Sequence, residues 1–158
     1  MCGLAGLVNL AGIDRDAVAP GLQRAVERLR LRGPDDNGVW FDDHAALGHT
    51  RLSIVDLSAA GHQPMVHGGL ALVYNGEIYN HADLRNQLQD AGVTFTGHSD
   101  TEVLLKGWAH WGEAILGRLN GMFAFALWDD DDQSLTLARD RFGKKPLIFA
   151  QNGTQLAF

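Results

Sequence analysis

Residues 122–128 (MFAFALW) constrain the fold more strongly than any other part of this sequence. All of them are apolar, so neither side of the segment is suited to face solvent. A short apolar run that ends at a turn signal, here the acidic residues 129–132, is typical of a strand covered on both faces. Such a strand requires more than two layers of structure. With 46% hydrophobic residues, a chain of 158 residues can build that core within one domain.

Apolar periodicity places helices between two groups of strands. Because the helices cluster instead of alternating with strands, an α+β layered fold is favoured over a doubly wound parallel sheet. We predict helices at residues 18–30, 81–91, 100–111 and 113–119. We predict strands at residues 3–10, 38–41, 45–52, 70–74, 122–128, 134–139, 147–150 and 156–158.

Local signals set the expected boundaries of these elements. Pro20 is tolerated only in a first helical turn, so the first helix is expected to begin near Val18. Ser99 is expected to cap the third helix in a capping box with Glu102. Residues 58–69 include three glycines and a proline, and we expect them to form a loop that lines a site.

Cys2 is the only cysteine of the chain. Removal of Met1 would place its thiol beside a free α-amine, and these groups are a nucleophile and a candidate base on one residue. The alternative is a small buried hydrophobic residue that lies near a terminus. One cysteine cannot form an internal disulfide or supply a cysteine-rich zinc site, and the seven histidines lack metal-binding spacings. We therefore predict no metal site.

The charge and the apolar runs argue against several classes of partner. A net charge of −6 without a basic stripe argues against nucleic acid and against an anionic membrane surface. No apolar run approaches the ~20 residues that span a bilayer. The first residues lack the basic region of a secretory signal, so a cytoplasmic protein is expected.

Six motifs occur in one order along the chain and together resemble a known family. The chain is similar to the N-terminal glutaminase domain of glutamine-hydrolysing asparagine synthetases, a class II glutamine amidotransferase. The resemblance implies an N-terminal-nucleophile hydrolase fold, a four-layer αββα sandwich of two antiparallel sheets. It also implies hydrolysis of the glutamine side-chain amide to glutamate and ammonia. The motifs are Met1-Cys2-Gly3, Arg32-Gly33-Pro34-Asp35, residues 51–56 (RLSIVD), residues 75–80 (NGEIYN), Ser99-Asp100-Thr101-Glu102 and residues 121–126 (GMFAFA).

The resemblance implies that Cys2, Asn75 and Gly76 form the catalytic group. Cys2 is then the nucleophile after removal of Met1, and the Asn75 side chain and the Gly76 backbone N–H form the oxyanion hole. By itself, Asn-Gly between two apolar runs is a strong signal for a type I′ hairpin turn. The two interpretations are compatible, because a tight turn can present an amide and a backbone N–H in one direction.

The resemblance also implies which residues bind glutamine. Arg51 is expected to bind the α-carboxylate, a role that suits the two-pronged guanidinium. Glu77 and Asp100 are expected to bind the α-ammonium, and the backbone around Ile54 and Val55 is expected to line the pocket. Taken singly, Arg51 could be a solvated charge, Glu77 a turn residue and Asp100 a first-turn helix acid.

Two departures limit the resemblance. Leu31 stands where family members commonly have histidine before Arg-Gly-Pro-Asp, which removes any local hydrogen bond of that histidine. No Ser-Gly-Gly-x-Asp pyrophosphate loop is present, and the chain ends inside an expected strand. We therefore expect residues 1–158 to be a glutaminase domain truncated near its C-terminal end. The run at residues 139–146 lacks a glycine-rich phosphate cradle, so a structural turn is expected there.

The resemblance also implies the cofactors and partners of the chain, and two alternative functions stay open. The domain itself should need no cofactor, and ATP and Mg²⁺ are expected only in a synthetase domain that these residues do not include. The expected partners are glutamine and that synthetase domain, with a homodimer left open. The alternatives are a non-catalytic binding or scaffold copy of the fold, and an amidotransferase that serves a different acceptor.

Overall fold

Strand β6 (Gly121–Asp129) is covered on both faces, as its apolar sequence predicts. In the computed structural model, which describes residues 1–158, β6 lies inside a four-stranded antiparallel sheet with the order β4-β5-β6-β7. Its neighbours are β5 (Leu70–Ile78) and β7 (Ser134–Arg139). The short strand β4 (Met65–His67) pairs only with the start of β5.

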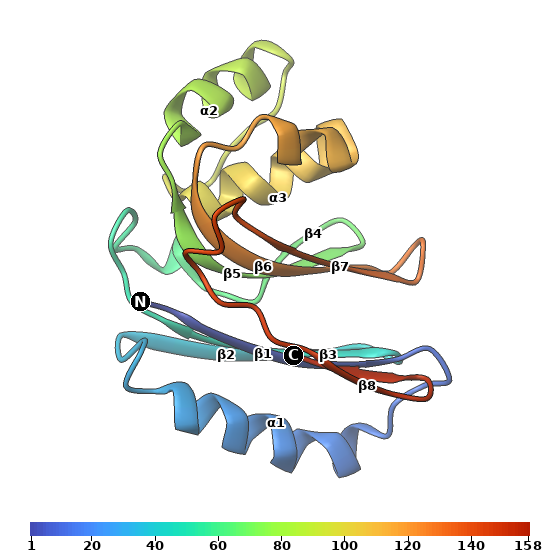
Figure 1. Cartoon of the computed structure of the whole chain (residues 1–158). Helices are drawn as coiled ribbons and strands as arrows, with labels where there is room; N and C mark the ends of the chain where they lie inside the picture. Colours follow the sequence, from blue (N-terminus) through green and yellow to red (C-terminus); the bar gives the residue numbers. More distant parts are fainter.

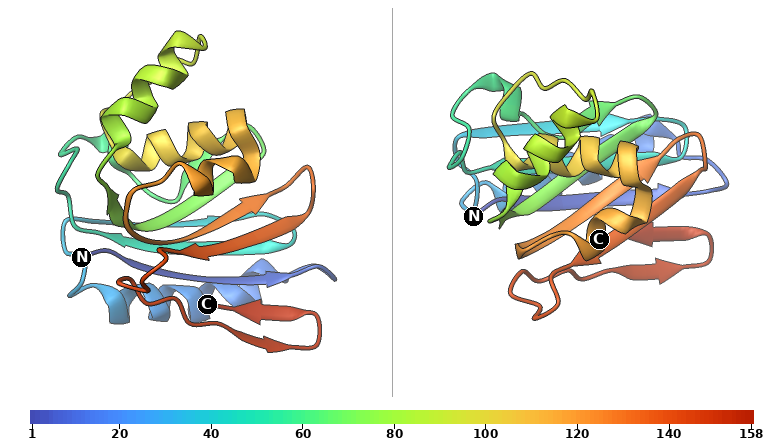
Figure 2. Two further views of the ribbon diagram at one scale, coloured as in Figure 1. Left: turned by 45° about the horizontal axis from the view of Figure 1, so that its top comes forward. Right: turned by 90° about the horizontal axis from the view of Figure 1, so that it is seen from above.

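The second sheet has five strands in the order β2-β3-β1-β9-β8, and all neighbouring strands are antiparallel. Because β1 lies at the centre of this sheet, the first residues of the chain are held at its end. Figure 2 shows β8 and β9 as a hairpin at the margin of the molecule. The strands are β1 (Gly3–Asn9), β2 (Asp36–Phe41), β3 (Ala45–Arg51), β8 (Ala150–Asn152) and β9 (Gln155–Ala157).

Helices cover the outer faces of the two sheets (Figure 1). Helix α1 (Arg15–Leu29) lies on the five-stranded sheet, and α3 (Asp100–Trp111) lies on the four-stranded sheet with α2 (His81–Asp90) outside it. A 3-10 helix, η2 (Gly112–Gly117), follows α3. The predicted α+β class, with a four-layer αββα sandwich of two antiparallel sheets, is confirmed. None of the helices is long and apolar enough to cross a membrane.

The two faces of β6 pack against different layers, because side chains alternate along a strand. Phe123, Phe125 and Leu127 are buried in a cluster with the helices that cover the sheet. Ala126 and Trp128 are buried between the two sheets. Each large apolar side chain buried in this way contributes roughly 1.5–3 kcal/mol, which explains why no polar residue interrupts the run.

Helix α1 begins earlier than predicted. Asp14 is its N-cap, and the Asp14 carboxylate accepts hydrogen bonds from the backbone N–H groups of Asp16 (3.0 Å) and Ala17 (3.4 Å). The helix therefore starts at Arg15, and Pro20 lies in its second turn. Pro20 is exposed, so solvent can reach the carbonyl that its missing N–H leaves without a partner.

Three other segments also differ from the prediction. The predicted loop at residues 58–69 contains a 3-10 helix, η1 (Ala59–Gly61), as well as β4. Residues 147–149 have no regular structure, and β8 begins only at Ala150. The helix predicted at residues 113–119 is the 3-10 helix η2. Each of these elements is only three to six residues long, which is too short for a clear apolar period in the sequence.

Candidate active site

Strand β5 runs without a turn through Asn75 and Gly76. Asn75 lies opposite Ala124 and Gly76 lies opposite Phe123 in the ladder with β6. A Cβ atom on Gly76 would lie 2.8 Å from Phe123 Cα and still closer to the Met122 carbonyl oxygen. Glycine is therefore required by the close approach of β6, and the alternative prediction of a hairpin turn is wrong.

The edge of β5 has no strand neighbour beyond Leu72, because β4 pairs no further along it. Backbone N–H groups point alternately to the two edges of a strand. On this edge the Tyr74 N–H donates to Gln63 Oε1 at 2.7 Å, and the Ile78 N–H donates to Asp100 Oδ2 at 3.0 Å. The Gly76 N–H lies between them and points to the same open edge.

A cavity opens at this edge of β5, and all eight predicted site residues line it. It is bounded by the residues before β1, the end of β3 and the following loop, the start of α3 and the start of β6. The structure thus brings the predicted residues together, and the roles assigned to them stay predictions. The eight residues are Cys2, Arg51, Ile54, Val55, Asn75, Gly76, Glu77 and Asp100.

Alternation along β5 directs its side chains to two different layers. Tyr74 packs in the helical cluster with α3, whereas Val73 packs between the two sheets. Asn75 lies on the same face as Val73 and therefore faces the five-stranded sheet, whose central strand begins after Cys2. Asn75 is buried and lines the cavity together with Cys2.

Two hydrogen bonds hold Cys2, one at its sulfur and one at its backbone carbonyl. The Leu52 N–H donates to Cys2 Sγ at 3.4 Å, and Arg32 Nε donates to the Cys2 carbonyl oxygen at 3.2 Å. Burial raises the pKa of the thiol, although the Leu52 hydrogen bond and the charge of the Met1 amine act in the opposite direction. The thiol is therefore protonated near neutral pH. Leu31, beside Arg32, is 92% exposed and takes no part in these contacts.

Arg51 is buried at the end of β3 and is fixed by the loop that follows. Its Nη1 donates to the Ser58 carbonyl oxygen at 2.9 Å, and its Nη2 donates to the Asp56 carbonyl oxygen. A guanidinium has five N–H donors, so three stay available. Arg51 forms no ion pair with a carboxylate of the chain. It is a positioned cation with unused donors at the cavity.

Asp100 is the first residue of α3 and binds β5 through one oxygen. Asp100 Oδ2 accepts from the Tyr74 hydroxyl at 2.7 Å and from the Ile78 N–H at 3.0 Å, while Oδ1 accepts from the Thr101 N–H at 3.0 Å. Burial and the nearby Asp100 charge raise the pKa of Tyr74, which keeps its hydroxyl a donor. A carboxylate has about four acceptor sites, so Asp100 keeps one for a cationic group. Glu77 forms no ion pair in the chain.

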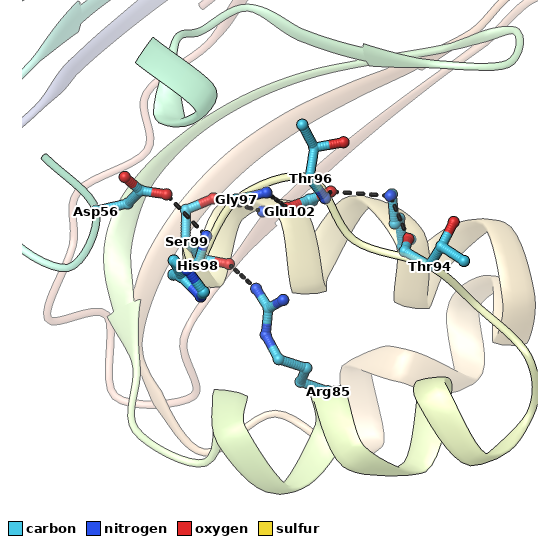
Figure 3. A network of polar contacts seen from close by, with 9 residues as sticks. Asp56, Arg85, Thr94, Thr96, Gly97, His98, Ser99 and Glu102 are labelled. Atoms are coloured by element: carbon cyan, nitrogen blue, oxygen red, sulfur yellow. Dashed lines mark hydrogen bonds and ion pairs between the residues drawn. The ribbon is translucent and has the colours of Figure 1, made fainter. Parts of the chain in front are cut away.

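The predicted capping box at the start of α3 is only half formed. Ser99 Oγ accepts from the Glu102 N–H at 3.1 Å, as expected. The Glu102 carboxylate does not return to Ser99, because it accepts from the N–H groups of Thr96 and Gly97, both at 2.8 Å, and pairs with Lys106 at 2.8 Å. Glu102 therefore organises the loop before α3 instead of capping the helix (Figure 3).

A second buried carboxylate connects this loop to the loop after β3 (Figure 3). Asp56 accepts from the Ser58 hydroxyl at 2.6 Å, from the Ser58 N–H at 2.8 Å and from the His98 N–H at 2.8 Å. These hydrogen bonds, with that of the Ser58 hydroxyl the strongest, lower the pKa of Asp56 to about 2. The side chains of Ile54 and Val55 are exposed, and both residues line the cavity.

Sequence reasoning missed several residues of the site. Lys145 is buried and lines the cavity, although the run at residues 139–146 was expected to have only a structural role. The run does form a turn, in which the Asp140 carboxylate accepts from the N–H groups of Lys144 and Lys145, both at 3.0 Å. Gln63 and Tyr74 also line the cavity. No local pattern marks these residues, because only the folded chain places them there.

His49 is a buried histidine on β3 whose environment favours the neutral ring. Its Nε2 lies 2.9 Å from the Tyr74 carbonyl oxygen, so Nε2 carries the hydrogen, and Nδ1 has no partner in the chain. Burial lowers the pKa of His49 to about 4, with Arg51 and His62 acting in the same direction and the Tyr74 carbonyl and Asp36 opposing.

The lowered pKa of His49 predicts a loss of stability on mild acidification. Above pH 6.5 the ring is neutral in both states; below it the unfolded chain binds a proton that the folded chain excludes until about pH 4. We expect the free energy of unfolding to fall by about 3 kcal/mol across this window. Urea unfolding of the parent protein and of His49→Gln at pH 7, 6, 5 and 4 measures the effect. Equal slopes in the two proteins would contradict the prediction.

Comparison with known proteins defines first the fold and then the family. The chain resembles the structure of glutamine phosphoribosylpyrophosphate (PRPP) amidotransferase from Bacillus subtilis complexed with ADP and GMP, with a TM-score of 0.73 at 23% sequence identity. This likeness covers 99% of this chain and 41% of the other, and it shows the fold. The sequence model of the family described as "Glutamine amidotransferase domain" matches residues 1–158. The chain therefore belongs to the class II glutamine amidotransferase domains.

Relatives with curated names are similar over the whole chain. Asparagine synthetase [glutamine-hydrolyzing] 3 of Bacillus subtilis (strain 168) is 41% identical, and the alignment covers 100% of this chain and 26% of that protein. A putative asparagine synthetase [glutamine-hydrolyzing] of Mycobacterium bovis is 42% identical over 99% of this chain and 27% of its own length. Amidase chry2 of Gibberella zeae is 39% identical over 99% of this chain and 25% of its own length. The chain thus spans about a quarter of the length of these relatives.

Proposed function

We propose that this chain hydrolyses the side-chain amide of glutamine to glutamate and ammonia, with Cys2 as the nucleophile after removal of Met1. The observation that supports this most directly is the arrangement of one cavity. Cys2, Asn75 and Gly76 all line it, and the Gly76 N–H points to the open edge of β5. A fixed, unpaired guanidinium and two carboxylates lie around the same space.

The proposed reaction passes through a thioester. Cys2 Sγ attacks the amide carbon while its proton passes to the α-amine of Cys2, whose ordinary pKa of roughly 7.7–8.0 suits a base near neutral pH. The oxyanion of the tetrahedral intermediate accepts hydrogen bonds from Asn75 and Gly76. The C–N bond then breaks as the protonated α-amine of Cys2 gives its proton to the amide nitrogen, which leaves as ammonia. Water attacks the thioester by the same proton path, releasing glutamate and restoring the thiol.

Met1 must be removed before Cys2 can act as proposed. It lines the cavity beside Cys2, and while it is present the nitrogen of Cys2 is part of a peptide bond and cannot act as a base. Its removal supplies the amine and widens the cavity in one step. The raised pKa of the thiol makes this base necessary.

Recognition of glutamine is proposed to use the charges that the chain leaves unpaired. Arg51 binds the α-carboxylate with its remaining donors, and Glu77 and Asp100 bind the α-ammonium. Burial of Arg51 and Asp100 strengthens their attraction to a zwitterion. With both charged groups held, the side-chain amide extends toward Cys2.

Replacing Arg51 by lysine is expected to raise the KM for glutamine about 10- to 100-fold, with a smaller effect on kcat. Lysine keeps the charge but loses the planar fork and the two contacts to the loop carbonyls, and hydrogen bonds to charged groups contribute ~1.5–3 kcal/mol. Steady-state glutamate release measures both constants. The control is Arg24→Lys on the exposed face of α1. An unchanged KM would contradict the assigned role.

We further propose that the ammonia serves ATP-dependent synthesis of asparagine from aspartate in a synthetase region outside residues 1–158, in a cytoplasmic protein. The names and the greater length of two of the relatives support this acceptor. ATP and Mg²⁺ are required only for that second reaction, and the glutaminase site needs no cofactor. The alternative is that the ammonia serves a different acceptor, and the similarity to the relative named Amidase chry2 supports this alternative.

Covalent labelling tests the proposed nucleophile and the need for Met1 removal together. The purified protein is treated with a diazoketone analogue of glutamine, and its intact mass is measured before and after. We expect one equivalent bound at Cys2 in molecules that lack Met1, none in molecules that retain it, and protection by glutamine. Absence of labelling in molecules without Met1 would favour a non-catalytic copy of the fold.

A further inference from the structure

Beyond Leu72, Tyr74 and Ile78 at the open edge of β5 bind side chains instead of a neighbouring strand. The Tyr74 N–H donates to Gln63 Oε1 at 2.7 Å, and His49 Nε2 donates to the Tyr74 carbonyl oxygen at 2.9 Å. Gln63 Nε2 in turn donates to Thr101 Oγ1 at 3.3 Å. Gln63 is 3% exposed and His49 is 0% exposed, so water does not substitute for either contact.

Only some of the backbone groups along this edge of β5 have hydrogen-bond partners. Gln63 and His49 satisfy Tyr74, Asp100 satisfies Ile78, and Gly76 between them is left free. A neighbouring strand would have continued the ladder and taken up the Gly76 N–H as well. Side-chain partners at alternate positions keep β5 extended while leaving one backbone donor for a ligand.

We propose that Gln63 and His49 are positioning residues that set the orientation of the oxyanion hole by holding both polar groups of the Tyr74 backbone. The Tyr74 carbonyl and the Asn75 N–H belong to one peptide unit. The hydrogen bond from His49 therefore fixes the plane of this peptide and, with it, the Asn75 Cα from which the side chain extends. The Gly76 N–H belongs to the next peptide unit, which joins this one at the Asn75 Cα, so its direction follows from the orientation of the first peptide. This inference rests on the catalytic role proposed above for Asn75 and Gly76.

The arrangement is unusual for a purely structural contact, because it leaves a buried polar atom without a partner. His49 Nδ1 has none in the chain, and such an atom carries a desolvation cost. An apolar residue at this position would avoid that cost and would leave the Tyr74 carbonyl unpaired instead. The donor at Nε2 is therefore the property that distinguishes His49 from a leucine of similar size.

The test separates positioning from stability with two variants of His49. His49→Leu removes the donor, whereas His49→Gln keeps an amide N–H that can reach the Tyr74 carbonyl. With the Met1-processed protein, we expect His49→Leu to lower kcat about 10- to 100-fold with KM within about twofold, as misplacement of a catalytic group does. His49→Gln should recover most of the lost kcat.

Matched controls keep the result interpretable. Thr50→Val removes a buried hydrogen bond on the opposite face of β3, where Thr50 Oγ1 donates to the Leu29 carbonyl oxygen at 3.2 Å. It should lower the melting temperature without changing kcat. If His49→Leu does not fold, the pair Gln63→Met and Gln63→Glu gives the same test, because only glutamate keeps an acceptor for the Tyr74 N–H.

The kinetic results for these variants distinguish this inference from the proposed function. A kcat loss that the donor-retaining or acceptor-retaining variant reverses supports the inference. If the parent protein is active but both variants of a pair lose kcat equally, this inference is overturned. It is also overturned if only KM changes. In both cases the proposed function stands. A processed parent protein that releases no glutamate would overturn the proposed function, and this inference with it.

Discussion

Replacement of Cys2 by alanine is expected to abolish the hydrolysis of glutamine. The variant keeps the α-amine, the oxyanion donors and the charged groups of the cavity, but no atom can form the thioester. Loss of a catalytic nucleophile typically lowers kcat by roughly four or more orders of magnitude. Glutamate release from purified protein, with intact mass confirming that Met1 has been removed, measures the effect.

The Cys2 variants also serve as a test of structure. Cys2 Sγ contacts only the Leu52 backbone through hydrogen bonds, so Cys2→Ala should fold with a melting temperature close to that of the parent protein. Cys2→Ser, which keeps a weaker nucleophile, should be strongly impaired and equally well folded. Undiminished glutamate release by Cys2→Ala would show that Cys2 is the small buried residue of the alternative interpretation.

Replacement of Asn75 by alanine is expected to lower kcat about 10²- to 10³-fold, with little change in the KM for glutamine. Loss of one oxyanion donor costs ~3–4 kcal/mol of transition-state stabilisation, because the charge on the oxygen develops only after attack. Under the proposed function, Arg51, Glu77 and Asp100 bind glutamine itself, so its affinity should change little. Steady-state kinetics of the processed protein separates the two constants.

Asn75→Asp is the matched variant for this prediction. Aspartate has nearly the same shape, but its carboxylate repels a developing oxyanion, so its kcat should be as low as that of Asn75→Ala or lower. Both variants should still be labelled slowly at Cys2, because the nucleophile is intact. A variant whose KM rises while kcat is kept would place Asn75 in substrate binding instead of the oxyanion hole.

Much of the fold could be predicted because its main signals are local. The uninterrupted apolar run of β6 reflects burial on both faces, and Leu135 and Leu137 of β7 pack on one face, as their spacing predicts. The start of α3 is marked by Ser99, whose hydroxyl caps the helix as expected. In each case, one segment carries in its own residues the environment that surrounds it.

The errors have a common physical origin in interactions between distant segments. Asn75-Gly76 satisfies the rule for a hairpin turn, but Gly76 is required because β6 passes too close for a side chain. Glu102 has the spacing of a capping box, yet its carboxylate binds the loop N–H groups of Thr96 and Gly97. Local statistics do not include a competing partner that only the fold brings near.

By itself, the sequence determined the residue types of the candidate site and the layered architecture that holds them. Cys2, Arg51, Asn75, Gly76 and Asp100 are recognisable in order along the chain, because their motifs are short and contiguous. Only the tertiary structure decided which of their groups are free. Whether a backbone N–H faces a strand or a cavity depends on where the neighbouring strand ends, and whether an arginine is paired depends on what folds against it. Both properties arise from packing between segments that the sequence keeps apart.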